Sequence, residues 1–286
     1  MANLKEIRNR ISSVSSTMQI TSAMKMVSAA KLKKAQDAIT AMRPYANKLT
    51  ELLQSLSATL DGDSGSKFAE QREVSKVLIV AIASNRGLCG AFNSNIIKEV
   101  TRLGKDKYTD QEVSYLTIGK KANDALSKTG NVIANKSEVF DDLTFDNVAE
   151  IAEMIMGKFV EGEYDKVELV YNKFKNAATQ IVMTEQFLPI VPMEEDTNVN
   201  LDYIFEPSKE DIVETLIPKS LKTQLYKSVR DSFASEHGAR MTAMHKATDN
   251  ATELRNQLKL TYNKARQAAI TNEILEIVSG AEALNS

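Results

Sequence analysis

Hydrophobic residues recur at intervals of three and four at both ends of the chain, which predicts a long helix at each end. An N-terminal set follows the narrow seam of a coiled coil: Leu4, Ile7, Ile11, Val14 and Met18. Residues 3–60 contain one proline and no glycine, and residues 208–284 contain one proline and two glycines. Each helix would be roughly 90–110 Å long at the usual helical rise, longer than a globular domain. We therefore expect the two helices to pair as an antiparallel coiled coil.

The segment between the two helices alternates between strand-like and helix-like patterns. Strands are expected at residues 76–83, 112–118, 132–134, 166–172 and 180–187, and helices at residues 91–103, 120–129 and 145–161. The run 76–83 is continuously apolar, which is typical of a strand buried on both faces. The alternation predicts a Rossmann-like α/β domain with a mostly parallel sheet. We expect three regions: an N-terminal shaft helix at 1–60, an inserted domain at 74–205, and a C-terminal shaft helix at 208–286 that pairs with 1–60.

Charge is distributed unevenly along the 286 residues. Residues 1–60 carry a net charge of +6, residues 61–207 carry −9, and residues 208–286 carry +1. Small and basic residues alternate at 28–35, where Lys31, Lys33 and Lys34 accompany serine and alanine. A basic helix of this kind predicts an acidic partner along the N-terminal helix, although solvated surface charge is the simpler explanation for any one lysine.

Composition narrows the classes of function. There is no run of 18 consecutive apolar residues, so we expect no direct insertion into a membrane. A single cysteine, Cys89, excludes an internal disulfide, and two histidines make a histidine-rich metal site improbable. Arg8, Arg10 and a cluster of serines resemble an organellar presequence, but the apolar pattern continues past any cleavage site, which favours a mature helix.

One turn could bind a phosphate, since RGLCG at residues 86–90 lies between a predicted strand and a predicted helix. Its G-x-x-G spacing matches neither the dinucleotide fingerprint nor the P-loop, and a tight turn explains the glycines. Cys89 lies far in sequence from any histidine and is expected to be a buried small side chain. Glu236 and Asp249 are expected to be surface charges. We therefore expect no cofactor, no metal and no catalysis by this chain alone.

Four blocks of sequence resemble the gamma subunit of the F-type ATP synthase. They are ITSAMKMVSAAKL at 20–32, RGLCG at 86–90 with Asn93, ARM at 239–241 through ATDN at 247–250, and YNKARQAAIT at 262–271 followed by Glu273 and EIVSGA at 276–281. The blocks occur in the family's order at both ends and in the middle. The resemblance therefore covers essentially the whole chain.

The resemblance implies a central rotor shaft that couples transmembrane proton flow to ATP synthesis and hydrolysis. It also implies that the shaft regulates ATPase activity and proton flow and is not itself catalytic. It implies that the C-terminal end enters a hexameric catalytic head of alpha and beta subunits. The inserted domain, together with the epsilon subunit, would lie near the membrane c-ring. A peripheral position on the cytoplasmic side of a bacterial cell membrane follows, and no nucleic-acid partner is implied.

The resemblance also implies which residues contact partners, because they stand at positions that make such contacts in the family. Contacts with the catalytic head are implied at Met24, Lys25, Arg240, Gln267, Thr271 and Glu273, and the basic stretch adds Lys31. Contacts on the ring side are implied at Tyr203, Phe205 and Glu206. Two departures stand out. His237-Gly238 replaces a Gln-Ala type pair, and Phe205 replaces a common tyrosine.

Two other functions remain open at this point. The chain could be a Rossmann-like nucleotide-binding enzyme with helical oligomerisation arms, which would bind ATP or NAD at the first strand-to-helix turn. It could also be a coiled-coil scaffold with a recognition domain, whose partners would include no ATPase head.

Overall fold

The computed structural model describes residues 4–57, 67–190 and 209–285 and divides them between two compact units. One unit spans Ala29–Arg240, and the other combines Met1–Ser28 with Met241–Ser286. The helix α1 (Leu4–Ser57) and the helix α5 (Lys209–Asn285) each contribute to both units. The two long helices expected from the apolar spacing are thereby confirmed.

The unit Ala29–Arg240 contains a five-stranded sheet in the order β3-β2-β1-β4-β5. The strands are β1 (Lys76–Ile82), β2 (Glu112–Ile118), β3 (Asn131–Asn135), β4 (Lys166–Phe174) and β5 (Gln180–Leu188). The first four run parallel, with Ile79 of β1 opposite Tyr115 of β2 and Glu168 of β4, and β5 pairs antiparallel to β4. The expected Rossmann-like, mostly parallel sheet is confirmed, with one antiparallel edge strand.

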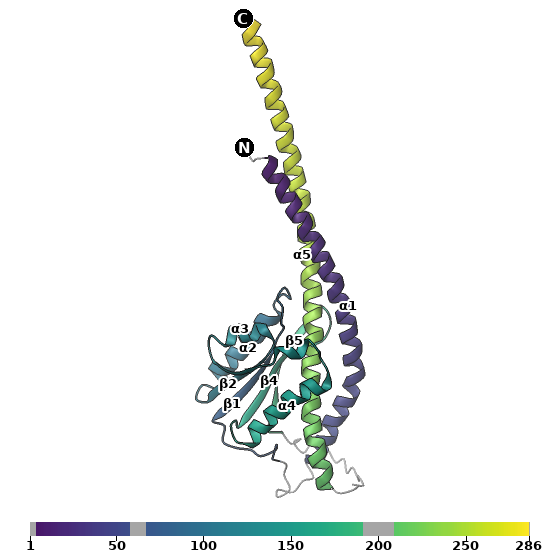
Figure 1. Cartoon of the computed structure of the whole chain (residues 1–286), viewed down its shortest axis with the longest axis vertical. Helices are drawn as coiled ribbons and strands as arrows, with labels where there is room; N and C mark the ends of the chain where they lie inside the picture. Colours follow the sequence, from purple (N-terminus) through teal and green to yellow (C-terminus); the bar gives the residue numbers. More distant parts are fainter. Residues whose placement is uncertain (1–3, 58–66, 191–208, 286) are drawn as a thin grey trace. The chain divides into compact units, whose positions relative to one another are not determined.

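Helices cover both faces of this sheet (Figure 1). On one face lie α2 (Phe92–Arg102) and α3 (Lys120–Leu126), and on the other lie α4 (Phe145–Val160) and the part of α5 that carries Leu221 and Leu225. The sheet forms because both faces of β1 bury aliphatic side chains, and Leu78, Ile79 and Val80 are inaccessible to solvent. A short 3-10 turn, η2 (Ser137–Phe140), precedes α4, whose first turn is capped by the Thr144 hydroxyl.

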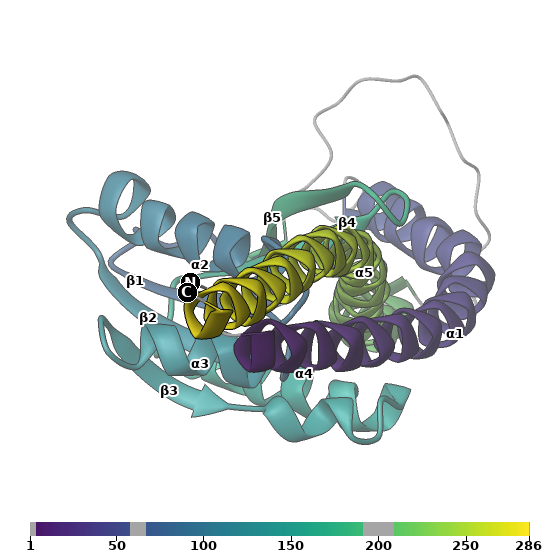
Figure 2. The same cartoon turned by 90° about the horizontal axis from the view of Figure 1, so that it is seen from above.

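The unit Met1–Ser28 with Met241–Ser286 is an antiparallel helix pair. The Thr248 hydroxyl donates to Thr21 Oγ1 at 2.8 Å, and Arg8 Nη2 donates to the Tyr262 hydroxyl at 2.7 Å. Arg8 lies thirteen residues before Thr21 on α1, whereas Tyr262 lies fourteen residues after Thr248 on α5. The two helices therefore run in opposite directions. Figures 1 and 2 show the two segments side by side.

Some local features differ from the sequence-based expectation. The third helix ends at Leu126 rather than near residue 129, and α2 continues into a π-helical turn, η1 (Leu103–Lys107). In that turn the Tyr108 amide bonds to the Leu103 carbonyl at 3.0 Å. The extra residue brings Lys107 Nζ and the Tyr108 hydroxyl each to 2.6 Å from Glu168 Oε1 on β4. The buried Glu168 carboxylate therefore has partners that apolar spacing does not reveal.

Candidate functional site

The C-terminal part of α5 exposes a series of large apolar side chains within its unit. Exposed fractions run from 47% to 65% for Leu260, Ile270, Ile274, Leu275, Ile277 and Val278. The predicted contact residues Gln267, Thr271 and Glu273 are exposed on the same stretch. Tyr262 bonds to Arg8 in the second turn of α1, so pairing with α1 can extend only about one turn further along α5. Figure 1 shows α5 continuing beyond the N-terminal end of α1. Exposed apolar side chains of this number on one helix indicate a surface that a partner covers.

A second exposed apolar group lies on α1 in the same unit. The side chains of Ile20, Met26 and Val27 are more than half exposed, and the predicted contact residues Met24 and Lys25 are half-buried beside them. Thr21, on the buried side of the same part of α1, faces Thr248 of α5.

The predicted head-contact residues of this unit therefore form two groups rather than one. Position 248, which lies opposite Thr21, precedes Gln267 by nineteen residues, so the groups are roughly 30 Å apart along α5. A partner that contacts both groups must span this length along the helix pair.

Lys31 and Arg240 lie in the other unit, Ala29–Arg240. Lys31 is exposed on α1. Its positive charge is close enough to α5 to oppose the rise that burial causes in the pKa of Glu236, and to add to the lowering that burial causes in the pKa of His237. Arg240 is only 7% exposed. Within this unit the structure thus brings Lys31 near Glu236 and His237, the neighbours of Arg240 on α5.

The Arg240 guanidinium is bound within the chain. Nη1 donates to Glu236 Oε1 at 2.7 Å, Nη2 donates to the carbonyls of Arg86 and Gly87 at 3.1 and 3.2 Å, and Nε donates to the Gly87 carbonyl at 3.3 Å. We name Arg86, Gly87, Glu236, His237 and Arg240 the Arg240 cluster. It joins α5 to the turn between β1 and α2. Arg240 therefore has a structural role that its assignment as a head contact did not anticipate.

The Arg240 cluster occupies the crevice where doubly wound sheets bind ligands. The crossovers through α2 and α3 cover one face and the crossover through α4 covers the other, so the sheet order reverses between β1 and β4. Beyond β1, the Ser84 amide and the Asn93 side chain bond to each other at 3.0 Å. Near the end of β4, the Ser235 hydroxyl of α5 donates to the Asn172 carbonyl at 2.9 Å. The chain's own α5 therefore occupies the space beside the carboxyl ends of β1 and β4.

Burial determines the protonation of this cluster. Burial, followed by the positive charges of Arg240 and Lys31, lowers the pKa of His237 to about 3. Burial also raises the pKa of Glu236, against the opposing effect of Arg240. The expectation that Glu236 is a surface charge was wrong, because Arg240 one helical turn away gives its carboxylate a buried partner. The expectation for Asp249 was right, since its side chain is 65% exposed.

Cys89 is buried, as expected, and its thiol accepts a hydrogen bond from Asn93 Nδ2 at 3.2 Å. Burial raises the pKa of the thiol, which disfavours the nucleophilic thiolate. Its neighbours Phe92 and Ala239 form a small apolar contact between α2 and α5. Cys89 therefore packs at the same contact, between α5 and the β1–α2 turn, that the Arg240 hydrogen bonds stabilise.

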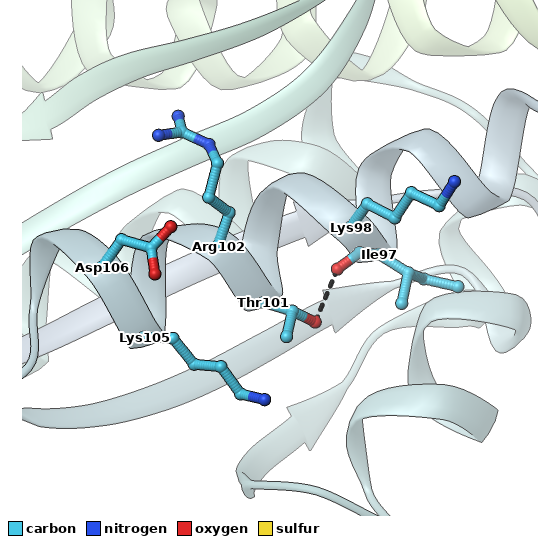
Figure 3. A pocket seen from close by; sticks show the side chains of 6 residues that line it. All are labelled: Ile97, Lys98, Thr101, Arg102, Lys105 and Asp106. Carbon is cyan, nitrogen blue, oxygen red and sulfur yellow. Dashed lines mark hydrogen bonds between the residues drawn. The ribbon is translucent and has the colours of Figure 1, made fainter.

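An open pocket of about 350 Å³ lies along the exposed side of α2 and η1 (Figure 3). It is lined by Ile97, Lys98, Thr101, Arg102, Lys105 and Asp106. Figure 3 shows Arg102 and Lys105 pointing in different directions, and Arg102 bonds to Glu99 at 2.6 Å. The charged groups do not converge on one point, so we assign no ligand to this pocket.

The described residues contain no group of three or more histidine, cysteine, aspartate or glutamate side chains placed to hold a metal ion. Within the same residues no helix is both long and apolar enough to cross a bilayer. The predicted ring-side residues Tyr203, Phe205 and Glu206 lie outside the described ranges.

Comparison with known proteins gives matches over almost the full length of this chain. The family described as ATP synthase matches residues 3–284. The chain is 78% identical over 285 residues to the ATP synthase gamma chain of Flavobacterium psychrophilum, with 99% of each chain covered. It is 75% identical over 286 residues to that of Flavobacterium johnsoniae, with 100% of each covered.

The fold of this chain resembles that of chains in solved structures. A chain of the Euglena gracilis mitochondrial ATP synthase, in a structure of OSCP, F1 and c-ring, superposes with a TM-score of 0.72 at 22% identity, covering 98% of this chain and 94% of that one. A chain from the central stalk and c-ring of the Tetrahymena thermophila mitochondrial enzyme gives a TM-score of 0.58 at 27% identity, covering 80% and 99%. The family match and the two Flavobacterium relatives show that the chain belongs to the ATP synthase gamma-chain family, the central-stalk rotor subunits of F-type ATP synthases.

Proposed function

We propose that this rotor subunit is non-catalytic and couples proton flow through a membrane c-ring to ATP synthesis and hydrolysis in a head of alpha and beta subunits, with epsilon as a further partner. The observation that carries the proposal is the exposed apolar surface of α5 around Ile270, Ile274 and Ile277. An isolated helix with this surface is unfavourable in water, and a surrounding ring of subunits would cover it.

The head-facing residues in this proposal are Met24 and Lys25 on α1 and Gln267, Thr271 and Glu273 on α5. All five are exposed or half-buried, so a partner can reach them. Their separation into two groups suits a hexameric head that contacts the shaft at two levels. The exposed side chains vary between apolar and polar, so contacts are distributed rather than concentrated in one deep anchor, as rotation requires.

Lys31 and Arg240 have different parts in the proposal. Lys31 is exposed and can attract an acidic segment of the head. Arg240 holds the β1–α2 turn on α5 and would act on the head through that turn, in which Leu88 is 64% exposed.

The ring side of the proposal rests on the resemblance alone. We place Tyr203, Phe205 and Glu206 at the c-ring, and we assign residues 74–205 to the coupling end and residues 1–60 with 208–286 to the shaft. The chain would then be peripheral to the cell membrane on its cytoplasmic side.

Assembly with the catalytic head tests the proposal. The chain is combined with alpha and beta subunits, and binding is compared for wild type, the double variant Ile274→Asp/Ile277→Asp, and the control Asn272→Asp, which places a carboxylate at an exposed polar position of the same turn. Burial of one such side chain is worth roughly 1.5–3 kcal/mol, so the double variant should bind at least about tenfold more weakly. The control should bind like wild type, and equal binding of all three would contradict the proposal.

The nucleotide-enzyme alternative is tested by titrating the isolated full chain with ATP and NAD. Because the Arg240 cluster fills the edge of the sheet where such a ligand would bind, we expect no stoichiometric binding there. Stoichiometric binding that is lost when Gly87 is replaced would favour the enzyme.

A further inference from the structure

The Arg43 side chain of α1 joins three elements of the unit Ala29–Arg240. Its Nη2 donates to Asp231 Oδ1 of α5 at 2.9 Å and to the Phe174 carbonyl, at the end of β4, at 3.0 Å. One guanidinium therefore ties α1 both to the neighbouring long helix and to the sheet. We call Arg43, Asp231 and the Phe174 carbonyl the Arg43 clamp.

The Asp231 carboxylate depends on this partner. Its side chain is fully buried, and Oδ2 has no hydrogen-bond partner within the described residues. Burial raises the pKa of Asp231, while the Arg43 guanidinium, and to a lesser degree the charge of Lys227 and the backbone of Phe174, lower it. A buried carboxylate that lost Arg43 would be an inadequately compensated charge, which proteins tolerate poorly.

The clamp lies where α1 is intrinsically weakest. Pro44 follows Arg43 directly, and proline has no amide hydrogen, so the Thr40 carbonyl receives no helical hydrogen bond from position 44. An unsupported proline inside a long helix is a site of bending. The two bonds of Arg43 hold the adjacent residue to α5 and β4 at this point.

The apolar contacts of α1 in this unit do not by themselves specify a register. The buried side chains are small or aliphatic: Leu32, Ala35, Ile39, Ala46 and Leu49. Such contacts are non-directional, whereas a single buried polar pair can fix the register of paired helices. The clamp supplies that directional contact.

We propose that the Arg43 clamp is a positioning device that holds α1 in register on α5 and the sheet, so that both long helices transmit rotation as one body within this unit. The inference rests on the proposed rotor function. Without the clamp, α1 shifts or bends at Pro44 under load, and part of the applied rotation is lost as internal movement.

Two variants separate positioning from stability. Arg43→Met leaves Asp231 buried without its partner and should destabilise the chain. The double variant Arg43→Met/Asp231→Leu removes both charges, which often restores stability. The matched control is Arg10→Met, which removes an exposed cation on the same helix that pairs with Glu6 at 3.1 Å.

Two measurements are made on each variant. In the free full-length chain, amide hydrogen exchange around residues 40–46 should speed up about tenfold or more in the double variant, because charged hydrogen bonds of this kind are lost, while its melting temperature stays near that of wild type. In the assembled enzyme in membrane vesicles, the number of protons pumped per ATP hydrolysed should fall in the double variant and remain at the wild-type value in Arg10→Met.

The outcomes separate the clamp from the rotor function. If the double variant has wild-type exchange and a wild-type pumping ratio, the clamp is only a stability feature and the inference is overturned. If wild type and Arg10→Met themselves fail to pump protons during ATP hydrolysis, it is the proposed rotor function that fails, whatever the exchange data show.

Discussion

At the scale of single residues, sequence patterns describe the buried residues 235–240 of α5 least well. Ser235, Glu236, His237 and Arg240 are all buried, although three of them are residue types usually found at the surface. Arg240 finds its carbonyl partners 153 and 154 residues earlier in the chain. The i,i+4 spacing of Glu236 and Arg240 is visible in the sequence, but the distant β1–α2 turn that Arg240 binds is not, which explains why Glu236 was expected to be exposed.

The buried His237 predicts a specific pH dependence of stability. Its pKa in the folded chain is about 3, and an unfolded histidine titrates near 6.5, so between these values only the unfolded state binds the proton. Stability attributable to this site is therefore complete above about pH 7 and falls as the pH drops, by up to about 1.4 kcal/mol per unit. We expect His237→Gln to reduce the loss of unfolding free energy between pH 7.5 and pH 5 by about 2 kcal/mol, measured by urea denaturation.

Glu236 acts with the opposite sign, because a carboxyl with a raised pKa favours the folded state at low pH. It is present in both proteins, so the comparison of wild type with His237→Gln isolates the histidine. An unchanged pH dependence in the variant would show that His237 does not remain neutral in the folded chain.

Gly238 explains one of the two departures from the family pattern. A Cβ atom at this position would lie 3.2 Å from the Ala177 Cα and 3.3 Å from the Ala177 carbonyl oxygen, in the turn between β4 and β5. Gly238→Ala gains up to about 1 kcal/mol of helix propensity but must displace this turn by a few tenths of an ångström, so we expect a net change near zero. The control Gly157→Ala, in α4 with nothing within 4 Å, should show the full gain in urea denaturation.

A bulkier residue at position 238 sharpens this test. Gly238→Leu should destabilise the chain by roughly 1–3 kcal/mol, because the turn cannot make room for a whole side chain. If Gly238→Ala instead stabilises the chain as much as Gly157→Ala, the close approach of Ala177 has no energetic consequence.

At the scale of elements, polar contacts rather than apolar ones distinguish one register of the terminal helix pair from another. We expect Thr248→Val, which removes the hydroxyl that bonds Thr21, to cost about 1 kcal/mol, and the double variant Thr21→Val/Thr248→Val to recover most of it. The cost is measured as faster amide hydrogen exchange around residue 21. The control Thr252→Val removes a hydroxyl that bonds only within α5, to the Thr248 carbonyl.

Non-additive effects of the two threonine changes would confirm that the hydroxyls act as a pair. If Thr248→Val has no more effect than Thr252→Val, the register of this helix pair does not depend on the contact.

The elements themselves were largely predictable. Apolar spacing identified both long helices, and the continuous apolar run at 76–83 identified the central strand, because these signals are local and strong. The π-helical turn was missed, since it depends on Glu168, which lies 60 residues beyond Tyr108. The contact residues remain predictions taken from the resemblance, and their grouping into two levels required the antiparallel pairing of α1 with α5.

At the scale of the whole molecule, the two units match the two demands on a rotor. The unit Met1–Ser28 with Met241–Ser286 exposes apolar helix surface that a partner can cover, and the unit Ala29–Arg240 has a sheet covered on both faces and fastened to both long helices. Variants can therefore alter the stability of the unit Ala29–Arg240 and the exposed surface of the other unit independently.

Direct observation of rotation tests the central claim. The chain is assembled with alpha and beta subunits fixed to a surface, a bead is attached to an exposed position of the α/β sheet domain, and ATP is added. We predict sustained rotation of the bead in one direction that stops when ATP is exhausted, and that is rarer with Ile274→Asp/Ile277→Asp because fewer complexes assemble. ATP hydrolysis by the assembled head while the bead remains stationary would contradict the assignment of this chain as the rotor.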